Sequence, residues 1–211
     1  MTAESAAGVA LGLYTLGLLV TFGVRTWSHR RATGSSGFRG LSGRPGSAPW
    51  WGGVLFVAAL LLTAGGFVLA MTGAVPAAAV PAVARWAGLV LATAAFAGVV
   101  LAQSGMGTSW RIGVDTTERT ALVTGGPFAL ARNPVFTAMC AALVGLVLMA
   151  PTVLTVAGLV CLVVAVELQV RVVEEPYLLA SHGGTYAAYA ARVGRFVPGV
   201  GQLRATSVVV S

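Results

Sequence analysis

The sequence has very few charged residues and contains no lysine. Only 9% of its 211 residues are charged, 57% are hydrophobic, and the mean hydropathy is +0.87. A soluble domain carries about 25% charged residues, so this chain lacks the polar surface that a water-exposed domain needs. The composition predicts a polytopic membrane protein, and the length leaves room for one helical bundle without a separate soluble domain.

The sequence also lacks the common metal and nucleotide motifs. No His/Cys cluster has zinc-like spacing, and neither a GxGxxG nor a P-loop is present. Cys140 and Cys161 lie in apolar runs, which favours packing roles over a disulfide or a metal site. We therefore predict no metal.

All 13 basic residues are arginines, and they give a net charge of +7. Most of them lie in short segments between apolar runs. Juxtamembrane arginines interact with anionic lipids, and this explains the charge better than binding to nucleic acid. The predicted partners are thus membrane lipids, with no nucleic acid.

Apolar runs predict about five transmembrane helices in an all-α bundle. The charge-free run that contains Pro151 is too long for one span, so we expect a tight helical hairpin there, with a short fourth helix. Arg85 is tolerated near the outer end of the third span, where its side chain can snorkel. The predicted spans are residues 5–24, 51–71, 80–103, 134–149 and 152–170.

The arginines also predict the orientation. The loop after the first span carries five of them and no acid, at Arg25, Arg30, Arg31, Arg39 and Arg44. The positive-inside rule places this loop in the cytoplasm, and then every later loop also obeys the rule. We expect the N-terminus outside, the C-terminus in the cytosol, and a location in a bacterial inner (plasma) membrane. Residues 104–133 and 171–198 then face each other on the cytosolic side, and chemistry is expected there.

The run VELQVRVVEEPYLL ends the fifth predicted span. On an α-helix, Glu167, Arg171 and Glu174 share one face, and Glu175 follows Arg171 by four residues. One interpretation is an interfacial salt-bridge ladder that ends the helix. The other is a pocket wall, because an ionisable residue at the hydrocarbon boundary faces the bundle interior or a wet cavity. In that case Glu174 and Glu175 would accept hydrogen bonds from ribose hydroxyls or an ammonium group, and Arg171 would hold a carboxylate.

The run GGTYAAYAARVGRFVP follows. Tyr186, Tyr189 and Arg192 are spaced three apart and can lie on one face of a short helix. They predict either an interfacial aromatic belt or a lid over a flat ligand such as adenine.

The run GGPFALARNP precedes the fourth predicted span. Gly125 to Pro127 predict a turn, and Asn133 with Pro134 predicts a helix start, with Asn133 as N-cap. This account leaves Arg132 unexplained. An arginine beside a helix N-terminus can bind a ligand carboxylate, because both favour a negative charge.

Taken together, the runs MGTSWRIGVD, LVTGGPFALARNPVF and EEPYLLASHGGTYAAYAARVGRFVP resemble the isoprenylcysteine carboxyl methyltransferase and phospholipid methyltransferase superfamily of integral membrane enzymes. Matching positions in the first block are Gly126, Pro127, Phe128, Arg132, Asn133, Pro134 and Phe136. Those in the second are Glu174, Glu175, Leu178, Gly183 or Gly184, Tyr186, Tyr189, Arg195, Phe196, Val197 and Pro198. The resemblance covers about residues 105–198.

The resemblance implies methyl transfer from S-adenosyl-L-methionine to a lipophilic acceptor that enters from the bilayer. With the hydropathy pattern, we expect one membrane domain over residues 1–211, with three spans in 1–103, the methyltransferase-like half in 104–198 and a tail in 199–211. Cofactor contacts carried over from the family are Phe128, Arg132, Asn133, Pro134, Glu174, Glu175, Tyr186 and Tyr189. We expect Arg171 and Glu174 to take part in catalysis, with Arg171 orienting the acceptor or the cofactor.

Two departures from the family pattern change what can be expected. Better-known members have histidine at the position of Asn133, so no acid–base role can rest on that residue. Pro176 directly follows the paired acids and is expected to kink or restart the helix. The alternatives are an NADPH-dependent membrane reductase, whose dinucleotide would call for more basic residues near the acids, and a non-catalytic membrane protein.

Overall fold

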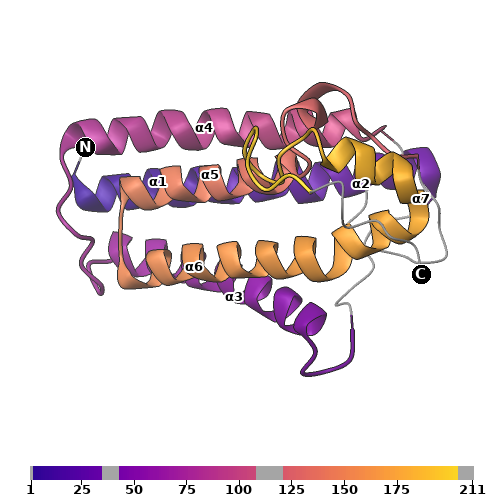
Figure 1. The fold of residues 1–211 in the computed structure, drawn as a ribbon. Coiled ribbons are helices and arrows are strands. Elements are labelled where there is room, and N and C mark those ends of the chain that lie inside the picture. The colour runs from indigo at the N-terminus through magenta and orange to yellow at the C-terminus, as the bar shows by residue number, and fades with distance from the viewer. Residues whose placement is uncertain (1, 35–42, 108–120, 204–211) are drawn as a thin grey trace.

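The computed structural model describes residues 2–34, 43–107 and 121–203, and every regular element in these ranges is a helix. The all-α prediction is confirmed for this part of the chain. Several long helices run side by side along one axis (Figure 1). In chain order the elements are α1 (Ala3–Leu18), η1 (Leu19–Val24), α2 (Arg25–Thr33), α3 (Ala48–Met71), α4 (Ala82–Gly105), η3 (Gly126–Ala129), α5 (Pro134–Met149), α6 (Val153–Leu168), η4 (Gln169–Glu174) and α7 (Glu175–Ala190).

Local sequence explains where these helices start. The Ser47 side chain caps α3, which has Pro49 in its first turn, and α4 begins directly after Pro81. Thr152 and Thr155 form a reciprocal capping box at the start of α6. The predicted breaks before the third span and at the hairpin are both present.

Four helical runs are long and apolar enough to cross a membrane: Ala3–Thr33, Ala48–Met71, Ala82–Gly105 and Val153–Ala190. The fifth apolar helix, α5, has only 16 residues and is about 24 Å long, as expected for the short arm of the hairpin. The chain is an integral membrane protein, and its orientation stays a prediction. The first and last runs extend well beyond the predicted ends at residues 24 and 170, because π-helical segments η1 and η4 continue the helix there instead of ending it.

The bundle contains two closely packed helix pairs. In the pair α4–α5, a Cβ on Gly145 would collide with the backbone of Ala92 and Gly88. In the pair α3–α6, a Cβ on Gly158 would collide with Thr63. Small residues allow such close approach of membrane helices, where van der Waals packing drives association. The first helix, α1, packs mainly against α3.

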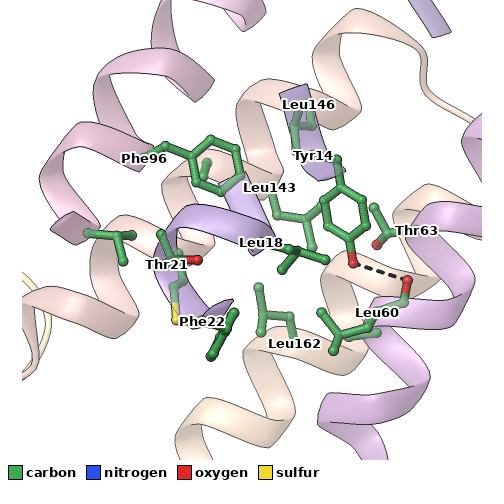
Figure 2. Close-up of a pocket in the computed structure, with 14 residues that line it drawn as sticks. Tyr14, Leu18, Thr21, Phe22, Leu60, Thr63, Phe96, Leu143, Leu146 and Leu162 are labelled. Carbon is green, nitrogen blue, oxygen red and sulfur yellow. Dashed lines mark hydrogen bonds between the residues drawn. The ribbon is translucent and has the colours of Figure 1, made fainter. Parts of the chain in front are cut away.

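A small cavity of about 40 Å³ lies between these pairs and α1 (Figure 2). Its lining is almost entirely apolar; the Tyr14 hydroxyl donates to the carbonyl of Leu60 at 3.1 Å. Ligand sites have volumes of about 300–1,000 Å³, so this void is a packing gap in the core. None of the residues predicted for the functional site lines this cavity.

The elements predicted to be cytosolic gather at one end of the bundle. Figure 1 shows α2, α7 and the segment that contains η3 at that end, while the α5–α6 turn lies at the opposite end. Segments far apart in sequence therefore meet where the sequence predicted chemistry.

Candidate functional site

The two sequence blocks that carry the family resemblance lie side by side. Ala131 and Gly194 form a parallel β-bridge. The Arg132 backbone N–H donates to the Gly194 carbonyl at 2.8 Å, and the Asn133 N–H donates to the Arg195 carbonyl at 3.1 Å. The entry to α5 is thus joined by backbone hydrogen bonds to the segment that follows α7.

Side chains of α5 strengthen this junction. The Asn133 amide donates to the Arg195 carbonyl at 3.1 Å, and the Thr137 hydroxyl donates to the Phe196 carbonyl at 2.8 Å. Gly194 is required at the turn, because a Cβ there would collide with the Val197 carbonyl. These contacts hold the segment after α7 against the first turn of α5.

Glu175 is the centre of a buried ion-pair cluster, made of Arg132, Glu175 and Arg195. Its Oε1 accepts from Arg132 Nη2 at 2.6 Å, and its two oxygens accept from Arg195 Nε and Nη2, both at 2.9 Å. The hydrogen bond with Glu175 raises the pKa of Arg195 above its ordinary value. Loss of the Glu175 charge would leave two guanidinium groups close together without their shared counter-ion.

Arg132 has further protein partners. Its Nη1 donates to the carbonyls of Ala190, at 2.7 Å, and Val193, and its Nη2 donates to that of Gly201 at 3.0 Å. The side chain is 1% exposed. Arg132 therefore caps the end of α7, where carbonyls lack helical partners and a cation is favourable. This explains structurally the residue that turn chemistry left unexplained, and its contact with a ligand stays a prediction.

Helix α5 begins at the predicted position, but the predicted capping hydrogen bond is absent. Asn133 is the N-cap and Pro134 occupies the first turn, as predicted. The Asn133 side chain makes no capping hydrogen bond, and its amide Nδ2 donates to the Arg195 carbonyl. Asn133 therefore serves the junction between the two blocks.

The expected salt-bridge ladder on the last long helix is only partly correct. Glu167 and Arg171 form the i,i+4 ion pair, with side chains 38% and 55% exposed. Glu175 instead joins Arg132 and Arg195, and the Glu174 Oε1 accepts from Gln169 Nε2 at 3.2 Å. The reason is η4, whose π-helical turns rotate the acids relative to Arg171.

Pro176 restarts the helix, as its position after the acids predicts. The π-helix ends at Glu174, and α7 begins at Glu175 with proline in its first turn. Proline has no backbone N–H, so the α-helical bond back to the Val172 carbonyl cannot form. The change of helix type occurs where that bond is missing.

Tyr186 and Tyr189 share one face of the second part of α7, after a kink at Gly183 (φ 51°). Their rings are 6.1 Å apart, and both residues are buried against Leu178, Leu179 and Val193, which removes them from a lipid-facing aromatic belt. The Tyr189 hydroxyl donates to the Phe128 carbonyl at 2.6 Å and so fixes the turn η3.

Tyr186 differs from Tyr189 in what surrounds its hydroxyl. Burial raises the pKa of its hydroxyl above its ordinary value, and the nearby Glu175 carboxylate raises it further, whereas the Tyr189 hydroxyl is bound to the Phe128 carbonyl. Phe128 and the tyrosine pair thus belong to one region, formed by η3 and α7. Its aromatic rings are buried, and Glu174, which directly precedes α7, is a half-buried carboxylate outside the ion-pair cluster.

The sequence patterns do not identify Gln169 as a site residue, and they do not predict the ion pair of Arg195. Gln169 was not singled out, although a polar residue between Leu168 and the buried Val170 signals a specific partner. Arg195 was noted only as part of a motif, and it is one of the two cations on Glu175. The run MGTSWRIGVD lies almost entirely outside the described residues, together with Arg39, Arg111, Arg119 and Arg204.

Within the described ranges, no group of three or more His, Cys, Asp or Glu residues could hold a metal ion. Cys140 and Cys161 are both free, half-buried and packed against the hydrophobic core.

Comparison with known protein families gives a match over part of the chain. The family model described as phospholipid methyltransferase matches residues 83–184, from the start of α4 to the kink in α7. No curated protein and no solved structure matches the chain.

Proposed function

We propose, from the match of residues 83–184 to the phospholipid methyltransferase family, that this chain is a membrane enzyme of that family and transfers a methyl group from S-adenosyl-L-methionine to a lipophilic acceptor. The observation that carries the proposal is the junction between the two sequence blocks. Arg132, from the first block, and Arg195, from the second, bind the same carboxylate of Glu175. Residues that the family pattern keeps in order along the chain thus build one region at one end of the bundle.

The residues of this region fit the chemistry of the cofactor. S-adenosyl-L-methionine carries ribose hydroxyls, a cationic sulfonium and an ammonium group. A carboxylate can accept hydrogen bonds from the hydroxyls and the ammonium group, and it can balance the positive charge. Glu174 is a half-buried carboxylate beside this region, and the rings of Phe128 and Tyr186 are buried within it. Glu175 is already balanced by two arginines, so Glu174 is the better candidate for the cofactor contact.

The cofactor, when bound, supplies a methyl group on a positively charged sulfur whose neutral thioether leaves readily. The work of the protein is therefore to hold and orient the reactants. Glu174 binds the polar groups of the cofactor, the tyrosine pair limits the access of water, and Arg171 orients a carboxylate or phosphate of the acceptor. The half-exposed Arg171 and Glu167 side chains suit a group that arrives from outside the bundle.

The acceptor is proposed to enter sideways from the bilayer. The long helices expose large apolar side chains such as Leu61, Leu101 and Val160, as expected for faces that contact lipid. The sixth helix continues from these faces directly into η4 and Glu174, so an acceptor at the membrane boundary lies close to the proposed pocket. The positive-inside rule favours the cytosolic face for this end.

Ligand binding tests the proposal. Purified protein in detergent or nanodiscs should bind S-adenosylhomocysteine in a calorimetric titration and should not bind NADPH. Tight binding of NADPH without S-adenosylhomocysteine would replace the proposal with a membrane reductase. Binding of neither ligand would favour a non-catalytic protein. Lipid extracts incubated with methyl-labelled cofactor would then identify the acceptor class.

A further inference from the structure

The π-helix η4 carries a polar pair that neither the sequence motifs nor the ion-pair cluster explains. Gln169 and Glu174 are its first and last residues, and the Gln169 amide donates to the Glu174 carboxylate at 3.2 Å. We infer that Gln169 is a positioning residue, which orients the Glu174 carboxylate for the ligand. This inference rests on the proposed function, since it assigns Glu174 to ligand binding.

The pair depends on the helix type. In an α-helix each residue turns by 100°, so residues five apart point about 140° away from each other. In a π-helix the backbone hydrogen bonds join residues five apart, so the side chains at these positions lie much closer together. The backbone has this form here, because the Glu175 N–H bonds to the Val170 carbonyl, five residues back.

The same π-helical turns separate the two acids. They direct Glu175 to Arg132 and Arg195 in the interior, and they bring Glu174 beside Gln169. Pro176 favours this arrangement, because its missing N–H removes an α-helical bond that a regular helix would keep. π-Helical turns of this kind are frequent at functional sites.

The chemistry of glutamine suits a positioning role. A neutral amide fixes one carboxylate oxygen through a charge-assisted hydrogen bond, and the amide itself does not neutralise the carboxylate that a cationic or hydroxyl-bearing ligand would bind. An arginine at the same position would neutralise that charge, as Arg132 and Arg195 do for Glu175. Gln169 directly follows the C-terminal end of α6 and lies between Leu168 and the buried Val170. An unpaired polar group is unfavourable in such an apolar setting.

A double-mutant cycle on S-adenosylhomocysteine binding tests the inference. Gln169→Met keeps the length of the side chain and removes the donor, so we expect affinity to fall by about 5- to 30-fold. Gln169→Glu places two carboxylates together and should weaken binding further. In a Glu174→Gln background, Gln169→Met should have no additional effect, because its role acts through Glu174. Val172→Ala, at an exposed position of the same π-helix, is the matched control and should bind like the wild type.

The experiment distinguishes failure of this inference from failure of the proposed function. If Glu174→Gln binds more weakly than the wild type, but Gln169→Met binds normally, the positioning role is overturned and the proposed function stands. An equal loss from Gln169→Met with and without Glu174 would also overturn it, because a merely structural residue behaves in that way. Absence of S-adenosylhomocysteine binding by the wild type would overturn the proposed function and this inference together. Thermal unfolding of each variant, measured in parallel, identifies any that fail to fold.

Discussion

Glu174 and Glu175 are neighbours in the sequence, yet they belong to regions of opposite character. Glu175 lies in the ion-pair cluster, where it binds two arginines, and surrounding backbone carbonyls accept further hydrogen bonds from Arg132. Glu174 ends a π-helix, is half-buried and is held by a neutral amide. The first region holds the fold together. The second contributes the half-buried carboxylate that we propose for the cofactor contact.

Two adjacent acids in a sequence motif therefore need not have the same role in the site. A buried carboxylate between two arginines is costly to disturb, because removal of one charge leaves the others unpaired in a low dielectric. A carboxylate at a partly exposed edge is less strongly coupled to the fold. The following predictions test the comparison by measuring how each region responds to the loss of one group.

The largest effect is expected at Glu175. Glu175→Gln removes the charge that balances Arg132 and Arg195, so the free energy of unfolding should fall by about 3–5 kcal/mol. Equilibrium unfolding in mixed micelles with increasing SDS measures it. The matched control is Glu174→Gln, which should change the free energy by less than about 1 kcal/mol. Equal losses in the two variants would remove the distinction between the two acids.

A smaller effect is expected at the tyrosine pair. Tyr189→Phe loses the hydrogen bond to the Phe128 carbonyl and should destabilise the protein by about 1 kcal/mol. Tyr186→Phe, its neighbour on the same face, should change stability by no more than about 0.5 kcal/mol. Both values come from the same SDS titration. A larger loss in Tyr186→Phe would mean that its hydroxyl, and not that of Tyr189, fixes the fold.

The smallest effect on stability is expected at Arg171. Its ion pair with Glu167 is more than a third exposed on both sides, so Arg171→Ala should change the free energy of unfolding by about 0.5 kcal/mol or less. If Arg171 orients the acceptor, methyl incorporation into a lipid extract should fall at least about tenfold, while S-adenosylhomocysteine affinity stays unchanged. Glu167→Ala is the matched control for loss of the ion pair. Unchanged incorporation in Arg171→Ala would leave Arg171 as part of an exposed ion pair only.

Much of the fold could be predicted from the sequence. Long charge-free runs, Pro81 and Pro151 mark the helices and their ends, because proline and charge both break a membrane span. The start of α5 at Asn133 and Pro134 was also readable, since these residues suit a helix N-terminus. Local rules of this kind depend on a few neighbouring residues, and a single sequence displays them directly.

The partners within the site could not be predicted in the same way. An α-helical count placed Glu174 and Glu175 on the face of Arg171, and the π-helix η4 moved both of them. No local rule indicates that Arg132 and Arg195, 63 positions apart, bind one carboxylate. Their pairing depends on how α5 and the segment after α7 pack together, which is a tertiary property.

The affinity of Glu174→Ala for S-adenosylhomocysteine tests the central claim most directly. The account predicts that this variant unfolds at the same temperature as the wild type and shows no measurable binding in a calorimetric titration. A Glu174→Ala protein that is folded and binds S-adenosylhomocysteine with unaltered affinity would contradict the account and would place the cofactor site elsewhere.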